Sequence, residues 1–457
     1  MRKFFSLPQY FLILTVLLIS SKSFAADCSS PISSAVTDTG ACDLPSGGLT
    51  VVSGGITSSG IVLNLSSTTS VGLNNAGSLI TTTSNSTIFS VNGGNITGGI
   101  INSGVMGNTV GGAGHGIKLN TATLAGGITN TSTGSMSVGN VYFYIIDTTL
   151  TGGINNYGSI FGNWGFFGGE SSSVISGGFN NAAGATLGGS IFGFHLESST
   201  LNGGLNNSGT ITTNFRPIYL DAGAIVNGGL NNSGVITNTG VGVDPSPTIM
   251  ILAGATINGG ITNAAAGSIV SVTSDAINNA GSIDFITNNG SISAATGFFG
   301  INNSGSINTL NNKQSNLTHT GLLPTNYNII INSASDFGKI AFTSISGTTN
   351  FGVYSSSTLA ADTTYSSVIT GLSAIDIASG TSGTFTDGDG SYDWTLVNSS
   401  GSIWDLITAY IAPSAASTLT SIQSASYGIA SQFAGFAMTT NYANMNTYDC
   451  GLFDAKG

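Results

Sequence analysis

Four acidic residues keep a nearly constant distance from a glycine pair that recurs through the middle of the chain. Asp147, Glu170, Glu197 and Asp221 precede their glycine pairs by 5, 7, 6 and 7 residues. If each repeat is one coil of a stacked structure, these carboxylates align at one turn, about 4.8 Å apart from coil to coil. Like charges at that spacing raise one another's pKa or recruit a cation. The pattern predicts either a strip that binds a divalent cation or a glycan, or a solvated turn that keeps the protein soluble.

Two further side chains extend this candidate ligand-binding set. His195 and Tyr219 each stand two residues before an acidic residue, so they share a face with it in an extended strand. The strip is interrupted in neighbouring coils, where Ala253 and Asn120 occupy similar offsets. That interruption favours the solvated turn over a binding site.

Aromatic residues concentrate in the same coils. Counting alternation back from the acidic residues places Tyr144, Phe167 and Phe194 on one face. This favours a stacked aromatic ladder in the core over a surface that stacks on sugars. Because Tyr142 and Phe143 are consecutive, we expect only one of them to point inward, which leaves some aromatic surface exposed.

Other candidate sites match known patterns only in part. Asp387, Asp389 and Asp393 occupy positions one, three and seven of a calcium loop, but a tyrosine and an asparagine stand where such a loop needs glycine and a bidentate glutamate. His115 has no nucleophile motif to accompany it. The three histidines are scattered along the chain with no cysteine near them, which disfavours a zinc site formed by them. The sequence indicates no cofactor.

These residues are positioned by a repeat. The segment 203–211 reads Gly-Gly-Leu-Asn-Asn-Ser-Gly-Thr-Ile, and related glycine pairs begin at steps of 28, 26, 25, 26, 25 and 31 residues from residue 98 onward. Apolar residues flank each Asn-x-Gly turn signal, and no repeat holds a helical pattern. We therefore predict an all-β fold, a single-stranded parallel β-helix over residues 51–320 with one repeat per coil. The predicted stack includes an asparagine ladder: Asn156, Asn181, Asn207 and Asn232.

The N-terminal segment indicates export. Residues 1–25 resemble a signal peptide, with two basic residues, an apolar core and a small-residue cleavage site. In residues 26–50, Cys28 and Cys42 bracket a 13-residue loop, which suits a disulfide-closed cap, with two free thiols as the alternative. Charged residues make up 6% of the 457-residue chain and its net charge is −11, so binding to nucleic acid through phosphates is disfavoured.

The C-terminal segments depart from the repeat. Residues 321–411 predict a β cap over the end of the solenoid, with Trp394 and Trp404 as candidates to cover it. Residues 412–446 carry an apolar stripe at helical spacing and predict a linker helix. Residues 447–457 are interpreted as the start of a translocator barrel that is truncated or missing.

Taken together, the signal sequence, the Asn/Gly/Ser/Thr solenoid, the ending Tyr392…Leu396…Trp404-Asp405-Leu406 and the apolar linker resemble the passenger of a bacterial autotransporter of the type V secretion class. The resemblance implies a right-handed β-helix, export across the inner membrane, and display at the outer membrane, on the cell surface or outside the cell. Its partner would be its own or a separate outer-membrane β-barrel translocator. The chain departs from the family pattern because no alternating membrane strands follow Asn446.

Two functions remain open at this point. Sparse charge, the repeat and the lack of a catalytic set favour an adhesin or structural surface protein, which would bind a ligand on a host or neighbouring cell. The alternative is a carbohydrate-active β-helix enzyme, a polysaccharide lyase or hydrolase that would use Glu170, Glu197 and Asp221. Only Lys118 and Arg216 are basic between residues 23 and 312, which disfavours that chemistry.

Overall fold

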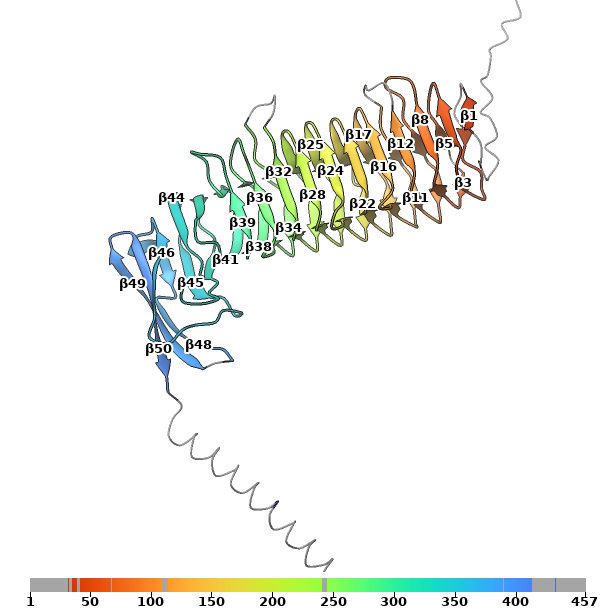
Figure 1. Cartoon of the computed structure of the whole chain (residues 1–457). Coiled ribbons are helices and arrows are strands. Elements are labelled where there is room, and N and C mark those ends of the chain that lie inside the picture. Colours follow the sequence, from red (N-terminus) through yellow and green to blue (C-terminus); the bar gives the residue numbers. More distant parts are fainter. Residues whose placement is uncertain are drawn as a thin grey trace, which may run out of the picture.

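The computed structural model describes residues 32, 35–38, 42–66, 68–108, 112, 114–240, 245–388, 390–412 and 432. Its fold is a parallel β-solenoid of about 13 turns that ends in antiparallel strands (Figure 1). This confirms the predicted parallel β-helix with a C-terminal β cap. The predicted signal peptide, the segment 447–457 and all but two residues of the predicted linker helix lie outside the described residues.

One coil shows how the repeat is used. Strands β26 (Thr200–Asn202) and β27 (Leu205–Asn207) lie in sheet B, β28 (Thr210–Thr213) lies in sheet C, and β29 (Arg216–Leu220) lies in sheet A. Each strand pairs in parallel with its counterparts in the coils before and after it. The glycine pair separates the two strands of sheet B, and the Asn-x-Gly segment turns the chain from sheet B into sheet C.

Buried asparagines form a continuous ladder along the solenoid. The Nδ2 atom of Asn181 donates to Oδ1 of Asn207 at 2.8 Å, and Asn207 donates in turn to Asn232 at 2.8 Å. The predicted ladder is confirmed, and the structure extends it to ten residues that are each at most 1% exposed: Asn75, Asn102, Asn130, Asn156, Asn181, Asn207, Asn232, Asn263, Asn288 and Asn312.

Two other features of the repeat follow from the close stacking. At Gly204 φ is +76°, and a Cβ atom there would lie 2.7 Å from the carbonyl oxygen of Gly228 in the next coil, so both conformation and space require glycine. Inside the coils, Leu205, Leu230 and Ile261 pair in register and are at most 2% exposed. They form an apolar ladder along the axis of the solenoid.

The strands of sheet A carry an aromatic ladder in the core and, on their outer face, several of the candidate ligand-binding residues. They include β13 (Ile117–Asn120), β17 (Val141–Ile146), β21 (Gly165–Glu170), β25 (Phe192–Leu196), β29 and β33 (Ile249–Ile251). Phe143, Phe167 and Phe194 pair in register on the inner face, and the rings of the last two stack at 4.5 Å. The expectation that Tyr144 shares this face was wrong, because Tyr144 pairs with Gly168 on the outer face.

The expectation that Tyr142 and Phe143 cannot both be inside was also wrong, since both are fully buried. Tyr142 stands near the corner where the chain enters sheet A, and its ring lies over Gly116 of the preceding coil, where a Cβ atom would approach the ring to 2.7 Å. The corner therefore allows two consecutive inward side chains, and strict alternation fails there.

The C-terminal end changes from parallel to antiparallel pairing. Strands β46 (Thr364–Thr370), β50 (Ile403–Ile411), β49 (Ser391–Ser400) and β48 (Ser382–Thr386) are antiparallel neighbours. Trp404 is 5% exposed and donates its indole N–H to the carbonyl oxygen of Leu372. Trp394 is 7% exposed and packs edge-on against Phe351. Parallel pairing in sheet B continues past residue 320, through β45 (Thr349–Val353) to β47 (Ile377–Ser379).

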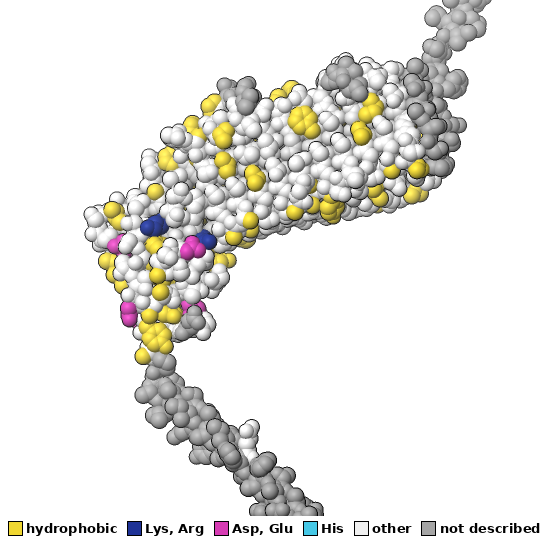
Figure 2. All heavy atoms as spheres, viewed as in Figure 1, with side chains coloured by type: hydrophobic (Ala, Val, Ile, Leu, Met, Phe, Trp, Pro, Cys, Tyr) yellow, Lys and Arg dark blue, Asp and Glu magenta, His cyan; other side chains and the backbone are white. Residues whose placement is uncertain are grey.

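Among the described residues, the 3-10 turn η1 (Ala374–Asp376) and residue 432 are helical, and no helix is both long and apolar enough to cross a lipid bilayer. On the face drawn in Figure 2, charged side chains gather toward the C-terminal strands, and the coils before them present mostly neutral side chains. Lys313 and Asp336 form an ion pair of 3.2 Å. The low charge of the sequence therefore corresponds to a largely neutral surface on this face of the coils.

We expect Asn207→Ala to destabilise the protein by about 3 kcal/mol, because it removes the ladder acceptor of the Asn181 amide, which keeps only its longer bond to Thr210, and the ladder donor to the buried Asn232 oxygen. The matched control is Asn206→Ala. The amide of Asn206, which is only half-buried, bonds to Asn180 and Asn231 of the neighbouring coils, and water can replace these bonds. That variant should cost less than about 1 kcal/mol. Urea unfolding of the two variants compares them, and equal losses would contradict a structural role for the buried ladder.

His319 gives a pH-dependent prediction. It lies in β42 (Leu317–Leu322), is fully buried against Phe342, and neither ring nitrogen has a hydrogen-bond partner among the described residues. Burial lowers its pKa from 6.5 to about 4. Between pH 6.5 and pH 4 this imidazole is therefore mainly protonated in the unfolded chain and mainly neutral in the folded chain. The free energy of unfolding consequently falls as the pH drops from 6.5 toward 4.

Between pH 7 and pH 4, we expect the free energy of unfolding to fall by about 3 kcal/mol more in the wild-type protein than in His319→Leu. Urea unfolding at pH 7 and at pH 4 measures the difference between the two proteins. Because His115 and His195 remain in both, their contribution cancels in the comparison. An identical pH dependence of both proteins would rule out His319 as its source.

Candidate binding site on the outer face of sheet A

Two ladders of side chains run along the outer face of sheet A. The first holds Lys118, Tyr144, Gly168, His195, Tyr219 and Met250. The second lies two residues further along each coil and holds Asn120, Ile146, Glu170, Glu197, Asp221 and Leu252. We call these twelve positions the sheet A surface.

Three of the four predicted acidic residues share the second ladder. Glu170, Glu197 and Asp221 each follow residues that pair in register. Asp147 does not join them, because Ile146 pairs with Glu170 and Asp147 lies one residue further on, exposed in a turn with φ of +46°. The acidic ladder is interrupted after Asp221 by Leu252 and not, as predicted, by Ala253. The N–H of Leu252 donates to the carbonyl oxygen of Leu220.

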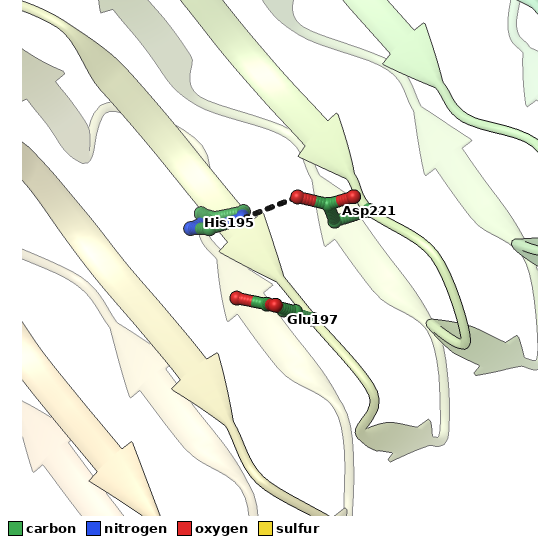
Figure 3. A group of neighbouring side chains, drawn as sticks. All are labelled: His195, Glu197 and Asp221. Carbon is green, nitrogen blue, oxygen red and sulfur yellow. Dashed lines mark ion pairs between the residues drawn. The ribbon is translucent and has the colours of Figure 1, made fainter.

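A compact group forms where His195, Glu197 and Asp221 meet (Figure 3). One potential ligand atom from each residue lies within 4.8 Å of the other two. His195 Nε2 is 3.7 Å from Asp221 Oδ2, with side chains that are 17% and 27% exposed. His195 comes from β25 and Glu197 follows that strand, while Asp221 follows β29 of the next coil, so the solenoid itself creates the group.

Stacked rings lie beside this group. His195 stacks on Tyr219 at 4.8 Å between ring centroids, and Phe192 stacks on both of them at 5.5 Å. The guanidinium of Arg216 lies 4.8 Å from the Tyr219 ring and donates to the hydroxyl of Ser246. Phe192 pairs with Arg216 as His195 pairs with Tyr219, so four side chains from two coils form one aromatic and cationic surface.

A second group lies two coils earlier. The imidazole of His115 stacks on Tyr144 at 4.4 Å, and the Tyr144 hydroxyl donates to Glu170 Oε2 at 2.9 Å. Gly168 stands between Tyr144 and His195 in the ladder and has no side chain. The two groups are therefore separate clusters on one surface.

Burial sets the protonation of these rings. It lowers the pKa of His195, although the charges of Asp221, Glu170 and Glu197 oppose the shift. It lowers the pKa of His115 to about 4. Burial, followed by the hydrogen bond and charge of Glu170, raises the pKa of Tyr144 to about 12. Near pH 7 the two imidazoles are neutral and the phenol keeps its proton.

Two of the predicted calcium ligands, Asp387 and Asp393, do not join this surface. Asp387 accepts hydrogen bonds from the backbone N–H groups of Leu359 and Gly390, and Asp393 accepts one from the Thr384 hydroxyl. Asp389 lies outside the described residues. Cys42 is disulfide-bonded, and Cys28, its predicted partner, also lies outside them.

Phe192 and Arg216 were missed by the sequence analysis as members of the site. The signal was present, because each stands three residues before a candidate residue, His195 or Tyr219.

Comparison with protein-family models, with curated proteins and with solved structures found no match. What the sheet A surface does must therefore be inferred from its chemistry.

Proposed function

We propose that the protein is an exported, surface-displayed rod of the autotransporter passenger type, acting as an adhesin or structural surface protein. We further propose that it binds a neutral polysaccharide on the sheet A surface. The fold supports the first part: a β-solenoid of about 13 turns is long and repetitive, and only 6% of the residues in the chain are charged. In this proposal its partners are an outer-membrane translocator and a polysaccharide of a host or neighbouring cell.

The observation that carries the ligand class is the stack of Phe192, His195 and Tyr219 beside Glu197 and Asp221. Flat apolar rings stack on the C–H face of a sugar, and carboxylate oxygens accept hydrogen bonds from its hydroxyl groups. This combination of apolar rings with a few fixed polar groups is typical of small-molecule sites.

An exposed aromatic residue also lies in the coil before Phe192. Trp164 is 51% exposed, and its carbonyl oxygen accepts from the N–H of Phe192 in the next coil. A chain-like ligand lying along the axis would meet the rings of Phe192 and Tyr219 in two successive coils. That arrangement favours a polymer over a single sugar.

We expect Phe192→Ala and Tyr219→Ala each to weaken binding to immobilised polysaccharides by about tenfold, since each removes a stacking ring. The panel consists of cellulose, chitin, dextran and alginate. Tyr157→Ala is the matched control, because Tyr157 is 52% exposed but lies at the turn between sheets B and C. Binding that is equally strong in all three variants would contradict the assignment of the surface.

The same assay separates the two function classes. Release of soluble sugar products that is lost in Glu197→Gln would favour the alternative, a carbohydrate-active enzyme using Glu170, Glu197 and Asp221. Surface display is tested in intact producing cells by accessibility of the solenoid to added protease. A protein protected until the cells are broken would contradict display.

A further inference from the structure

The group formed by His195, Glu197 and Asp221 has the composition and the spacing of a metal centre. One nitrogen and two carboxylate oxygens lie within 4.8 Å of one another. We propose that these three residues bind a divalent transition-metal ion of the zinc class. The proposal goes beyond the polysaccharide function and does not depend on it.

The His195 nitrogen provides an observation that is independent of the two acidic residues. Its Nε2 atom is shielded from solvent and has no hydrogen-bond partner among the described residues. Asp221 Oδ2, at 3.7 Å, is beyond hydrogen-bond reach. Leaving a buried polar atom without a partner is unfavourable. Coordination to a metal would satisfy this nitrogen.

The geometry allows a metal with small adjustments. Bonds of about 2.0–2.2 Å in a tetrahedral zinc site place the ligand atoms roughly 3.4 Å apart. The Glu197 side chain is exposed, so it can rotate toward the other two ligands. Its exposure also leaves the fourth coordination position open to solvent. Such a centre has three protein ligands and one exchangeable ligand.

The protein holds two of the three ligands in place. The imidazole of His195 is stacked against the rings of Phe192 and Tyr219, which fixes its plane. Asp221 accepts the N–H of Ala222 through Oδ1, so Oδ2 is the oxygen turned toward His195. A nitrogen ligand favours zinc and its neighbours over calcium or magnesium, which prefer oxygen.

The test is isothermal titration calorimetry of the full chain with zinc sulfate alone. We expect one saturable site per chain, with affinity lowered by about 100-fold or more in His195→Gln. Glu197→Gln and Asp221→Asn should each lower it by at least about tenfold. Asp147→Asn is the matched control, because it removes one nearby negative charge from outside the group and asparagine tolerates its positive φ.

The absence of saturable zinc binding would overturn the proposal. Binding that is unchanged in His195→Gln, or weakened equally by Asp147→Asn, would overturn it as well. Glu197 is exposed, so a loss of affinity in Glu197→Gln with an unchanged circular dichroism spectrum reports on the metal and not on folding. Since no polysaccharide is present, failure of this test leaves the proposed function standing, and the reverse also holds.

Discussion

The hydrogen bond between buried amides of successive coils is the interaction on which the rest of the structure depends. The apolar ladder of Leu205, Leu230 and Ile261 drives burial, but apolar contacts have no direction and tolerate a two-residue slip, which keeps the same face inward. An amide such as Asn207 tolerates none, because both its donor and its acceptor face neighbouring coils inside the core. Once the amides are aligned, every equivalent position along the rod is aligned too.

The alignment brings residues about 25 positions apart into contact, and this has an electrostatic cost. Carboxylates on consecutive coils lie close together and repel one another. Neutral residues at these positions would avoid that repulsion. In the coils before and after the acidic group the ladder holds Ile146 and Leu252, yet three consecutive coils hold Glu170, Glu197 and Asp221. One of these charges is offset by the hydrogen bond from Tyr144, and the other two face His195. The ligands that we propose for this group would offset the charges that remain.

The sequence predicted the fold well because the repeat marks its own register. Asn181 and Asn207 are recognisable as equivalent positions without any knowledge of the structure. The hydrogen bond between them can therefore be predicted from the sequence. Prediction failed where the coils differ in length. The acidic residues are spaced irregularly, and a one-residue shift at a corner moved Asp147 off the ladder and reversed the face of Tyr144. The paired inward side chains Tyr142 and Phe143 were not predictable either, because the space they need comes from Gly116 in another coil.

The predictable part of the site and the unpredictable part have different physical origins. His195 and Glu197 share a face because alternation within one strand requires it. Their contact with Asp221 requires the register between coils, and their support by Phe192 and Arg216 requires the shape of the corner. A rod built this way presents its side chains in lines parallel to its axis instead of gathering them in one cleft. Ligands that contact several coils at once then gain affinity from many modest contacts, each of which alone is weak. An extended polymer along the rod, anchored at the His195 coil, is the ligand that we propose for this surface.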